Sequence, residues 1–295
     1  MSAETALTVQ DQVLASLRSG NESLASGGSG KLDRRVGIIT GVGPESGIGA
    51  AAARLFAREG ARHLYLIDRN DTHIQPLLHH LNLLYPSTKT TFHLADAASP
   101  LAIWSIINAV LEEEGRLDFF FANAGMLQVV DPKFGKDKDA SARSYGRAIG
   151  EIGEDEVCEI FRINALAPYI AIKYASAAMS RLCPEKGKTI PGGSIVLTAS
   201  VGGLKANAGP IPYSAAKASV ISMAQTSAFA LTGTNIRVNA ICPGFIDTDM
   251  TKDLTESARA NNMDDGTMLN PTLRRGLGME SAKELMVLER GLVLY

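Results

Sequence analysis

Short apolar runs alternate with longer segments of helical pattern from residue 36 onward. The β-rich runs cover residues 36–40, 63–67, 90–95, 118–122, 194–199 and 235–241, and the helical candidates cover 47–59, 72–84, 101–113, 154–182 and 213–231. Such alternation is typical of βαβ units around a parallel sheet. The runs are continuously apolar, as burial on both faces requires. We therefore predict an α/β fold with a doubly wound parallel sheet between two helical layers.

Two segments depart from this alternation and set the domain organisation. Residues 1–30 end in a Ser/Gly-rich run, which is typical of a flexible tether, so we predict an N-terminal extension. A polar stretch at 131–150 follows the fourth strand, and a loop of about 20 residues is usually functional or mobile. The remainder of 31–295 is predicted to form a single domain.

Composition excludes several classes of protein. A net charge of −2 argues against a nucleic-acid partner, and no run approaches the ~18 apolar residues of a membrane span. The three cysteines lack the spacing of a disulfide framework or a zinc site, so no metal is predicted. We expect them to be buried in a protein of a reducing compartment, the cytoplasm. All five histidines lie in residues 63–93, so a second-half active site would need another base.

A glycine-rich segment, TGVGPESGIG, joins the first strand to the first helix. Its members Gly41, Gly43, Gly47, Ile48 and Gly49 allow a sharp turn and a close approach of the backbone to a pyrophosphate. The N-terminus of the following helix offers free N–H groups and partial positive charge. In this position the segment indicates a dinucleotide site in a Rossmann-type sandwich, whereas the alternative is an ordinary glycine-rich turn.

Asp68 ends the second strand, where a carboxylate can accept the ribose hydroxyls of an adenosine. The same charge would repel a 2′-phosphate, which favours NAD over NADP. Arg69 keeps NADP open, because its guanidinium could grip a phosphate or stack on adenine. The segment Gly187-Lys188-Thr189 resembles the end of a phosphate-binding P-loop, but position 182 is Leu and no strand precedes it, so phosphoryl transfer is discarded.

Tyr213 and Lys217 are four residues apart at the start of a helix and therefore project from one face. A nearby ammonium stabilises a phenolate, and lowering its pKa by about 3 units corresponds to about 4 kcal/mol. Ser200 closes the fifth strand, where its hydroxyl could hold a substrate oxygen. These residues form a candidate proton-transfer site, although each alone is an ordinary surface or turn residue.

The chain resembles the short-chain dehydrogenase/reductase family from about residue 31 to 251. The resemblance rests on the glycine segment, Asp68, Asp96, Asn123-Ala124-Gly125, Asn164, Ser200, Tyr213, Lys217 and Pro243-Gly244. It implies that Tyr213 is the general acid/base and that Lys217 lowers its pKa while holding the nicotinamide ribose. Ser200 would orient the substrate oxygen, and Asn164 would position a water.

The same resemblance implies further cofactor contacts. Asp96 would meet the adenine, Asn123 would brace the sheet, and Ile246 and Thr248 would touch the carboxamide. It also implies a homodimer or homotetramer that pairs the helices predicted at 154–182 and 213–231.

Two departures from the family pattern stand out. The glycine segment carries two extra residues, Pro44 and Glu45, and a carboxylate near phosphates should not help affinity. The family's seventh strand is shortened or absent, and we predict that Leu292 to Tyr295 replace it.

The function predicted from the sequence is NAD(P)-dependent interconversion of a secondary alcohol and a ketone, which are small-molecule substrates. Two alternatives remain open. One is a cofactor-binding protein that has lost turnover, and the other is a non-redox reaction, such as dehydration or isomerisation, at the same tyrosine.

Overall fold

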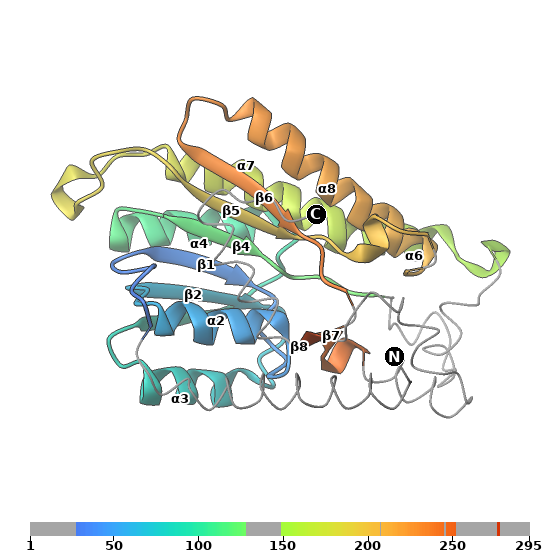
Figure 1. Cartoon of the computed structure of the whole chain (residues 1–295), viewed down its shortest axis with the longest axis horizontal. Coiled ribbons are helices and arrows are strands. Elements are labelled where there is room, and N and C mark those ends of the chain that lie inside the picture. The colour runs from blue at the N-terminus through green and yellow to red at the C-terminus, as the bar shows by residue number, and fades with distance from the viewer. Residues whose placement is uncertain (1–27, 128–148, 207, 245, 252–275, 278–295) are drawn as a thin grey trace, which may run out of the picture.

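The computed structural model describes residues 28–127, 149–206, 208–244, 246–251 and 276–277. Six strands form one parallel sheet in the order β3-β2-β1-β4-β5-β6. They are β1 (Val36–Thr40), β2 (His63–Asp68), β3 (Lys89–Leu94), β4 (Phe119–Ala122), β5 (Gly193–Thr198) and β6 (Ile236–Ile241). All six predicted strands are present, and the doubly wound α/β fold is confirmed (Figure 1).

Helices cover both faces of this sheet. They are α2 (Ile48–Arg58), α3 (Ile74–Leu84), α4 (Pro100–Glu114), α6 (Glu154–Phe161), α7 (Ala167–Met179) and α8 (Ile211–Ala230). Side chains of α2 and α3 pack on one face, and those of α4, α7 and α8 pack on the other. Figure 1 shows this three-layer arrangement, with the strands running in one direction between the helical layers.

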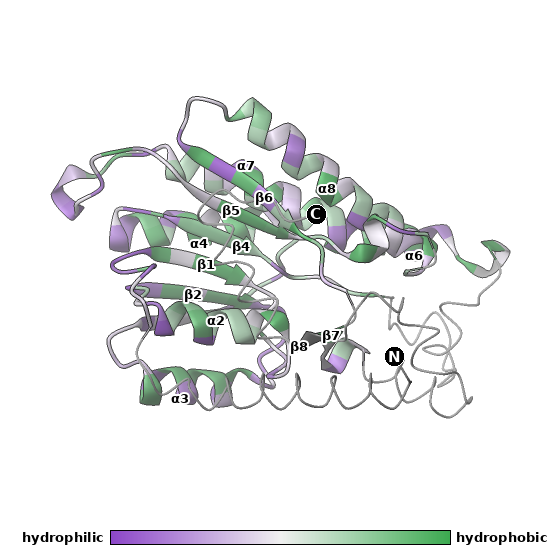
Figure 2. Ribbon diagram, viewed as in Figure 1, coloured by the Kyte–Doolittle hydropathy of each residue, from purple (hydrophilic) through white to green (hydrophobic). Residues whose placement is uncertain are grey.

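Each face of the sheet has its own apolar core, because alternate residues of every strand point to opposite sides. On β4, Phe119 and Phe121 belong to the core under α2 and α3, whereas Phe120 belongs to the core under α4 and α7. Burial on both sides explains why the central strands are apolar throughout, and Figure 2 shows them mostly in the hydrophobic colour. The helices alternate between colours, as a half-buried helix must.

The chain changes direction across the sheet at β1. This strand pairs with β2 on one side and with β4 on the other. The connections on its two sides therefore lead away from each other, which leaves a crevice beyond the carboxyl ends of β1 and β4. Ligands of open α/β sheets bind in this crevice.

The single helix predicted over residues 154–182 is wrong. The structure has α6 and α7 there, joined by a π-helical turn at Arg162–Leu166. Pro168 lies in the first turn of α7, and it has no N–H to donate to the carbonyl of Asn164 four residues earlier. Without this hydrogen bond the helix can take one extra residue per turn, which gives the π-helical geometry. Such turns are frequent at functional sites.

The expectation of buried cysteines is also wrong. Cys158 is exposed, and Cys183 and Cys242 are only partly buried. Cys158 lies on α6, where only Glu156 and Ile160 are buried, and the helix turns Cys158 away from these two positions toward the surface.

A polar cluster lies where α4 ends against β2 and β3. His63, Glu113 and Glu114 bring atoms together that could ligate a metal. The His63 Nδ1 atom lies 2.9 Å from Glu114 Oε1, and Arg62 and Lys89 pair with the two carboxylates. The charges of the cluster are thus balanced within the protein.

Several predictions fall outside the described residues. The N-terminal extension (except 28–30), most of the 131–150 segment and the strand predicted at Leu292 to Tyr295 cannot be compared, so they remain predictions. A short pair of strands, β7 (Ile246–Asp247) and β8 (Gly276–Leu277), lies beside the crevice. Within the described part of the chain, none of the helices combines the length and apolarity that a membrane span needs.

Candidate active site

A cavity of about 360 Å³ opens at the carboxyl ends of the strands. Most of the predicted site residues line it, and these are Gly41, Gly43, Gly47, Ile48, Asp68, Asn123, Asn164, Ser200, Tyr213, Lys217, Ile246 and Thr248. They come from positions more than 200 residues apart, and the parallel strands bring them to one edge of the sheet. The two remaining predicted residues, Gly49 and Asp96, lie outside this lining.

The glycine segment forms a backbone cradle that has no room for side chains. Gly41 has φ +75°, and a Cβ there would lie 2.7 Å from the Cα of Ala124. A Cβ on Gly49 would lie 2.1 Å from the carbonyl oxygen of Gly41, so this glycine lets α2 approach the turn. The cradle and the N-terminus of α2 together match what a dinucleotide pyrophosphate requires.

The two additional residues of this segment do not place a negative charge in the cavity. Glu45 Oε1 forms a 3.0 Å ion pair with Arg54 Nη2, and Glu45 is mostly exposed. Pro44 lines the cavity in its place. The Ser46 hydroxyl accepts a hydrogen bond from the N–H of Asp249 at 3.0 Å, which ties the segment to the loop after β7.

Asp68 faces the glycine segment from the end of β2. Its Oδ2 accepts a 2.8 Å hydrogen bond from the N–H of Gly43, and its Oδ1 accepts one from the N–H of Asn70 at 3.0 Å. Arg69 and His73 line the same end of the cavity. Backbone N–H groups thus hold both oxygens of this carboxylate, and Arg69 gives it a cationic neighbour.

Asn123 connects three strands beneath the cavity. Its Nδ2 donates to the carbonyl of Gly41 at 3.0 Å, and its Oδ1 accepts from the Thr198 hydroxyl at 3.1 Å. Its N–H donates to the Thr40 hydroxyl at 3.1 Å. The side chain thereby fixes the glycine segment against β5.

Asp96 lies beside a smaller cavity of about 80 Å³ that also contacts Gly41 and Asp68. Its Oδ2 accepts a 2.6 Å hydrogen bond from Arg162 Nη1, and its Oδ1 accepts one from the N–H of Ala98 at 2.8 Å. Both carboxylate oxygens are therefore already engaged by the protein.

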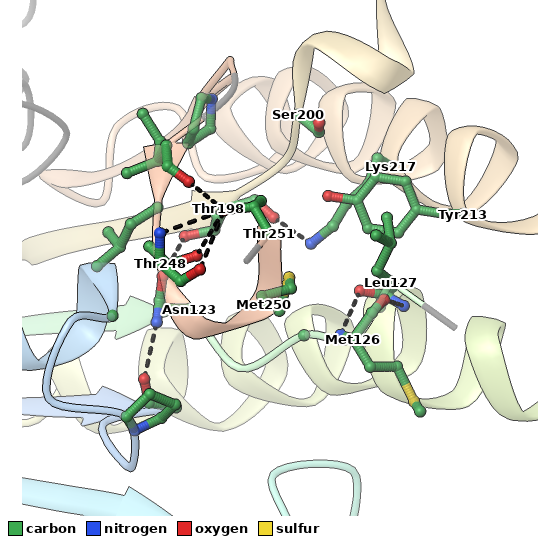
Figure 3. Close-up of a pocket in the computed structure, with 18 of the residues that line it drawn as sticks. Asn123, Met126, Leu127, Thr198, Ser200, Tyr213, Lys217, Thr248, Met250 and Thr251 are labelled. Carbon is green, nitrogen blue, oxygen red and sulfur yellow. Dashed lines mark hydrogen bonds between the residues drawn. The ribbon is translucent and has the colours of Figure 1, made fainter. Parts of the chain in front are cut away.

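Tyr213 and Lys217 project side by side from α8 into the cavity, and Ser200 lies next to them at the end of β5 (Figure 3). The Lys217 ammonium donates a 2.7 Å hydrogen bond to the carbonyl of Thr198 and lies 5.7 Å from the centre of the Tyr213 ring. Burial lowers the pKa of Lys217 to about 8. The side chain is still mostly charged at pH 7.

The pKa of Tyr213 differs from the sequence-based expectation. Burial raises it above its usual value, and only the hydrogen bond with Ser200 acts in the opposite direction. The pKa rises because removing the phenol from water disfavours the phenolate. The Lys217 ammonium points to Thr198 rather than to the phenol oxygen, so the protein alone does not produce the expected lowering.

Asn164 is fully buried in the π-helical turn. Its Nδ2 donates to the carbonyls of Met126 and Ile160 at 2.8 and 3.1 Å, and its Oδ1 accepts from the N–H of Met126 at 3.2 Å. A Cβ on Gly125 would lie 2.9 Å from this Oδ1 and 3.3 Å from Lys217 Nζ. The glycine thus lets the amide and the ammonium approach each other beside the loop that follows β4.

Sequence reasoning missed several residues of the cavity wall. They include His73, Thr198, Val201 and Ala208. Thr198 had a signal, since it precedes Ser200 at the same strand end. Val201 and Ala208 had none, because apolar residues outside the regular strands and helices have no pattern that separates cavity walls from surface.

A doubly wound sheet with a glycine cradle and a Tyr/Lys pair at one crevice defines an oxidoreductase that uses a nicotinamide cofactor. The comparisons with known proteins agree. The sequence model of the short chain dehydrogenase family matches residues 35–259. The chain is similar to the 3-oxoacyl-[acyl-carrier-protein] reductase FabG of Thermotoga maritima, with 31% identity over 78% of this chain and 81% of that protein. It is also similar to the mitochondrial borneol dehydrogenase of Lavandula x intermedia, with 28% identity over 76% of this chain and 73% of that protein.

Among solved structures, levodione reductase superimposes with a TM-score of 0.69 at 27% identity, covering 87% of this chain and 90% of that one. The chain therefore belongs to the short chain dehydrogenase family, as the resemblance implied. Enzymes of this family are oxidoreductases that act on small molecules with NAD or NADP, and they are commonly oligomeric.

Proposed function

We propose that the protein interconverts a secondary alcohol and a ketone, with Tyr213 as the general acid/base and NAD(H) as the preferred cofactor. One observation carries the proposal: Ser200, Tyr213 and Lys217 line the same cavity as the glycine cradle. Hydride transfer needs a cofactor and a proton donor at one carbon centre, and this cavity offers the groups for both.

The bound nicotinamide supplies or accepts the hydride, and the protein handles the proton. The Ser200 hydroxyl donates to the substrate oxygen and holds it beside the phenol. In the reductive direction Tyr213 releases its proton to that oxygen, and in the oxidative direction the tyrosinate takes the proton back. The raised pKa keeps the buried phenol protonated at pH 7 but makes it a weaker acid, so release of its proton to the substrate needs a group that stabilises the phenolate.

The Lys217 ammonium is the group that can stabilise this phenolate. It lies on the same face of α8 as the phenol, and its positive charge lowers the free energy of the phenolate that forms when Tyr213 gives up its proton. The hydrogen bond to Thr198 fixes the amine in the cavity, where the ammonium can also meet the hydroxyls of a nicotinamide ribose. Asn164 holds Met126 and so shapes the wall opposite these groups.

The experiment that tests this function is a panel of alcohols and ketones incubated with the enzyme and each nicotinamide cofactor. Consumption of a substrate with an equal change in nicotinamide absorbance is the expected result. Substrate loss without an absorbance change would identify dehydration or isomerisation instead. Tight cofactor binding without turnover of any substrate would identify a binding protein.

The preference for NAD leads to a prediction about Asp68. Changing Asp68→Ala should shift the ratio of kcat/KM values toward NADP by at least about tenfold, because juxtaposed like charges cost several kcal/mol and Arg69 remains. The ratio is measured from steady-state rates with both cofactors. Asp71→Ala is the matched control, since Asp71 is an exposed carboxylate outside the cavity lining. An unchanged ratio in Asp68→Ala contradicts the assignment.

For assembly we propose a homodimer or homotetramer that pairs the 154–182 segment, which contains α6 and α7, and α8. Four small residues of α8 are exposed, namely Ala215, Ala218, Ser222 and Ala230, and the apolar Phe229 is exposed near them. Such small residues let two helices approach closely. Cytoplasmic location remains a prediction from the cysteine pattern.

A further inference from the structure

A second cavity, of about 390 Å³, lies at the end of the sheet where the strands begin. The starts of β1, β4, β5 and β6 and the 187–193 segment form its walls. Figure 1 shows the yellow loop before β5 at this end, opposite the arrowheads at which the nicotinamide cavity lies. The two cavities are therefore separated by the length of the sheet.

The walls of this cavity are strongly cationic. Arg35, Arg116, Lys188 and Arg237 line it, and Asp118 is the one carboxylate among its lining residues. The excess of three positive charges is unusual for a chain whose net charge is −2. A concave surface with one sign of charge concentrates counter-ions.

Asp118 is fully engaged and organises the guanidinium groups. Its oxygens accept hydrogen bonds from Arg116 Nε and Nη2 at 2.8 and 2.7 Å, and from the N–H of Val36 at 2.9 Å. Arg35 Nη1 lies 3.4 Å from the same carboxylate, with half of its side chain exposed. The carboxylate thus fixes two guanidinium groups in the wall without neutralising the cavity.

Lys188 is buried at 3% exposure, and burial lowers its pKa. It donates to the carbonyls of Leu117 and Gly192 at 2.8 and 3.3 Å. An ammonium has three donors, so these two carbonyls leave one, and none of the described carboxylates forms a salt bridge with it. The charge of Asp118 offsets part of the cost of burying this ammonium without a direct contact, and an anion in the cavity would offset more of it.

The Ser194 hydroxyl provides an independent sign of a ligand. Ser194 lines the cavity at 5% exposure, and its hydroxyl has no hydrogen-bond partner in the described structure. Leaving a buried hydroxyl unpaired costs about 1–3 kcal/mol. An acceptor oxygen at the cavity wall would remove that cost.

We propose that this cavity binds a multivalent oxyanion of the phosphate type. Guanidinium forks match the oxygens of phosphate, ammonium groups add a point charge, and the serine hydroxyl adds a donor. The Gly187-Lys188-Thr189 segment takes part here through Lys188, although it is not a P-loop. The site is independent of the oxidoreductase site, so either assignment can fail alone.

The test measures anion binding by calorimetry on enzyme saturated with its nicotinamide cofactor, so that the cofactor site is filled. Three probes are titrated separately: inorganic phosphate, diphosphate and adenosine monophosphate. Wild-type enzyme should bind at least one of them at millimolar concentration or below. Arg35→Gln combined with Arg237→Gln should weaken that binding by at least about tenfold, because two charged contacts are lost. The tightest probe tells whether free phosphate or a phosphate ester is the natural source.

Arg181→Gln is the matched control, since Arg181 is an exposed arginine outside the cavity. The Arg181→Gln enzyme should bind the anion as tightly as the wild type does. Ser194→Ala should weaken binding by a smaller factor, because it removes one neutral donor. All variants should retain wild-type turnover, which verifies folding. Equal affinity of wild type and the double variant, or no binding of any probe by the wild type, overturns the proposal.

Discussion

Replacing Tyr213→Phe should lower kcat by about 10²–10⁴, which is the usual contribution of a positioned acid/base group. The variant keeps the ring and loses only the hydroxyl, which is hydrogen-bonded with Ser200. Cofactor binding should therefore stay close to wild type, because the glycine cradle and Asp68 are untouched. The measurement pairs steady-state kinetics with a cofactor-binding titration.

Tyr169→Phe serves as the control for removal of a phenol hydroxyl. Tyr169 is half exposed on α7 and does not line the cavity, so its variant should turn over normally. If Tyr213→Phe were as active as wild type, the proton would have to come from another group. Asp68 and His73 line the cavity from the end of β2 and the loop after it, and β1 and β4 separate β2 from β5, which Ser200 follows.

The fold follows from the sequence because burial on both faces of a parallel sheet leaves a strong local pattern. Runs such as Phe119-Phe120-Phe121 are buried at every position, as a strand in the middle of such a sheet requires. The ends of the strands agree with the prediction to within one residue, for example at β3 and β5. The break at Arg162–Leu166 was missed, since Pro168 can occupy the first turn of a helix and the sequence does not say that one begins there.

The site was predictable where spacing along one element determines geometry. Tyr213 and Lys217 share a helix face, and the glycine segment follows a strand directly. Contacts between distant segments were not predictable. The pairing of Glu45 with Arg54 moves a carboxylate out of the cavity, and the bond between Lys217 and Thr198 turns the ammonium from the phenol. Both contacts depend on side-chain rotamers, which the local sequence pattern does not determine.

The pKa of Lys217 links the stability of the protein to its activity. A value of about 8 against an ordinary 10.5 means that burial of this charge opposes folding by about 3 kcal/mol at pH 7. Only part of that cost is recovered by the hydrogen bond to Thr198, which contributes about 1 kcal/mol. The cofactor-free protein therefore retains an unfavourable group at its active site, as functional sites often do.

Lys217→Met should consequently raise the free energy of unfolding by about 2 kcal/mol at pH 7 and abolish most turnover, since methionine fills the space without the charge. The stability difference should be full below pH 8, shrink as pH rises toward 10.5, and vanish above it. In that interval the unfolded wild-type chain binds a proton that the folded one has released, so only the wild type gains stability with pH from this group.

Denaturant unfolding of cofactor-free protein across this pH range measures the difference. Lys173→Met is the control, because Lys173 is exposed and should show no such trend. A Lys217→Met variant that is less stable than wild type at pH 7 would mean that the ammonium stabilises the fold, and its role would then be structural. A more stable variant without turnover would show that the Lys217 ammonium is needed for the reaction even though it lowers the free energy of unfolding.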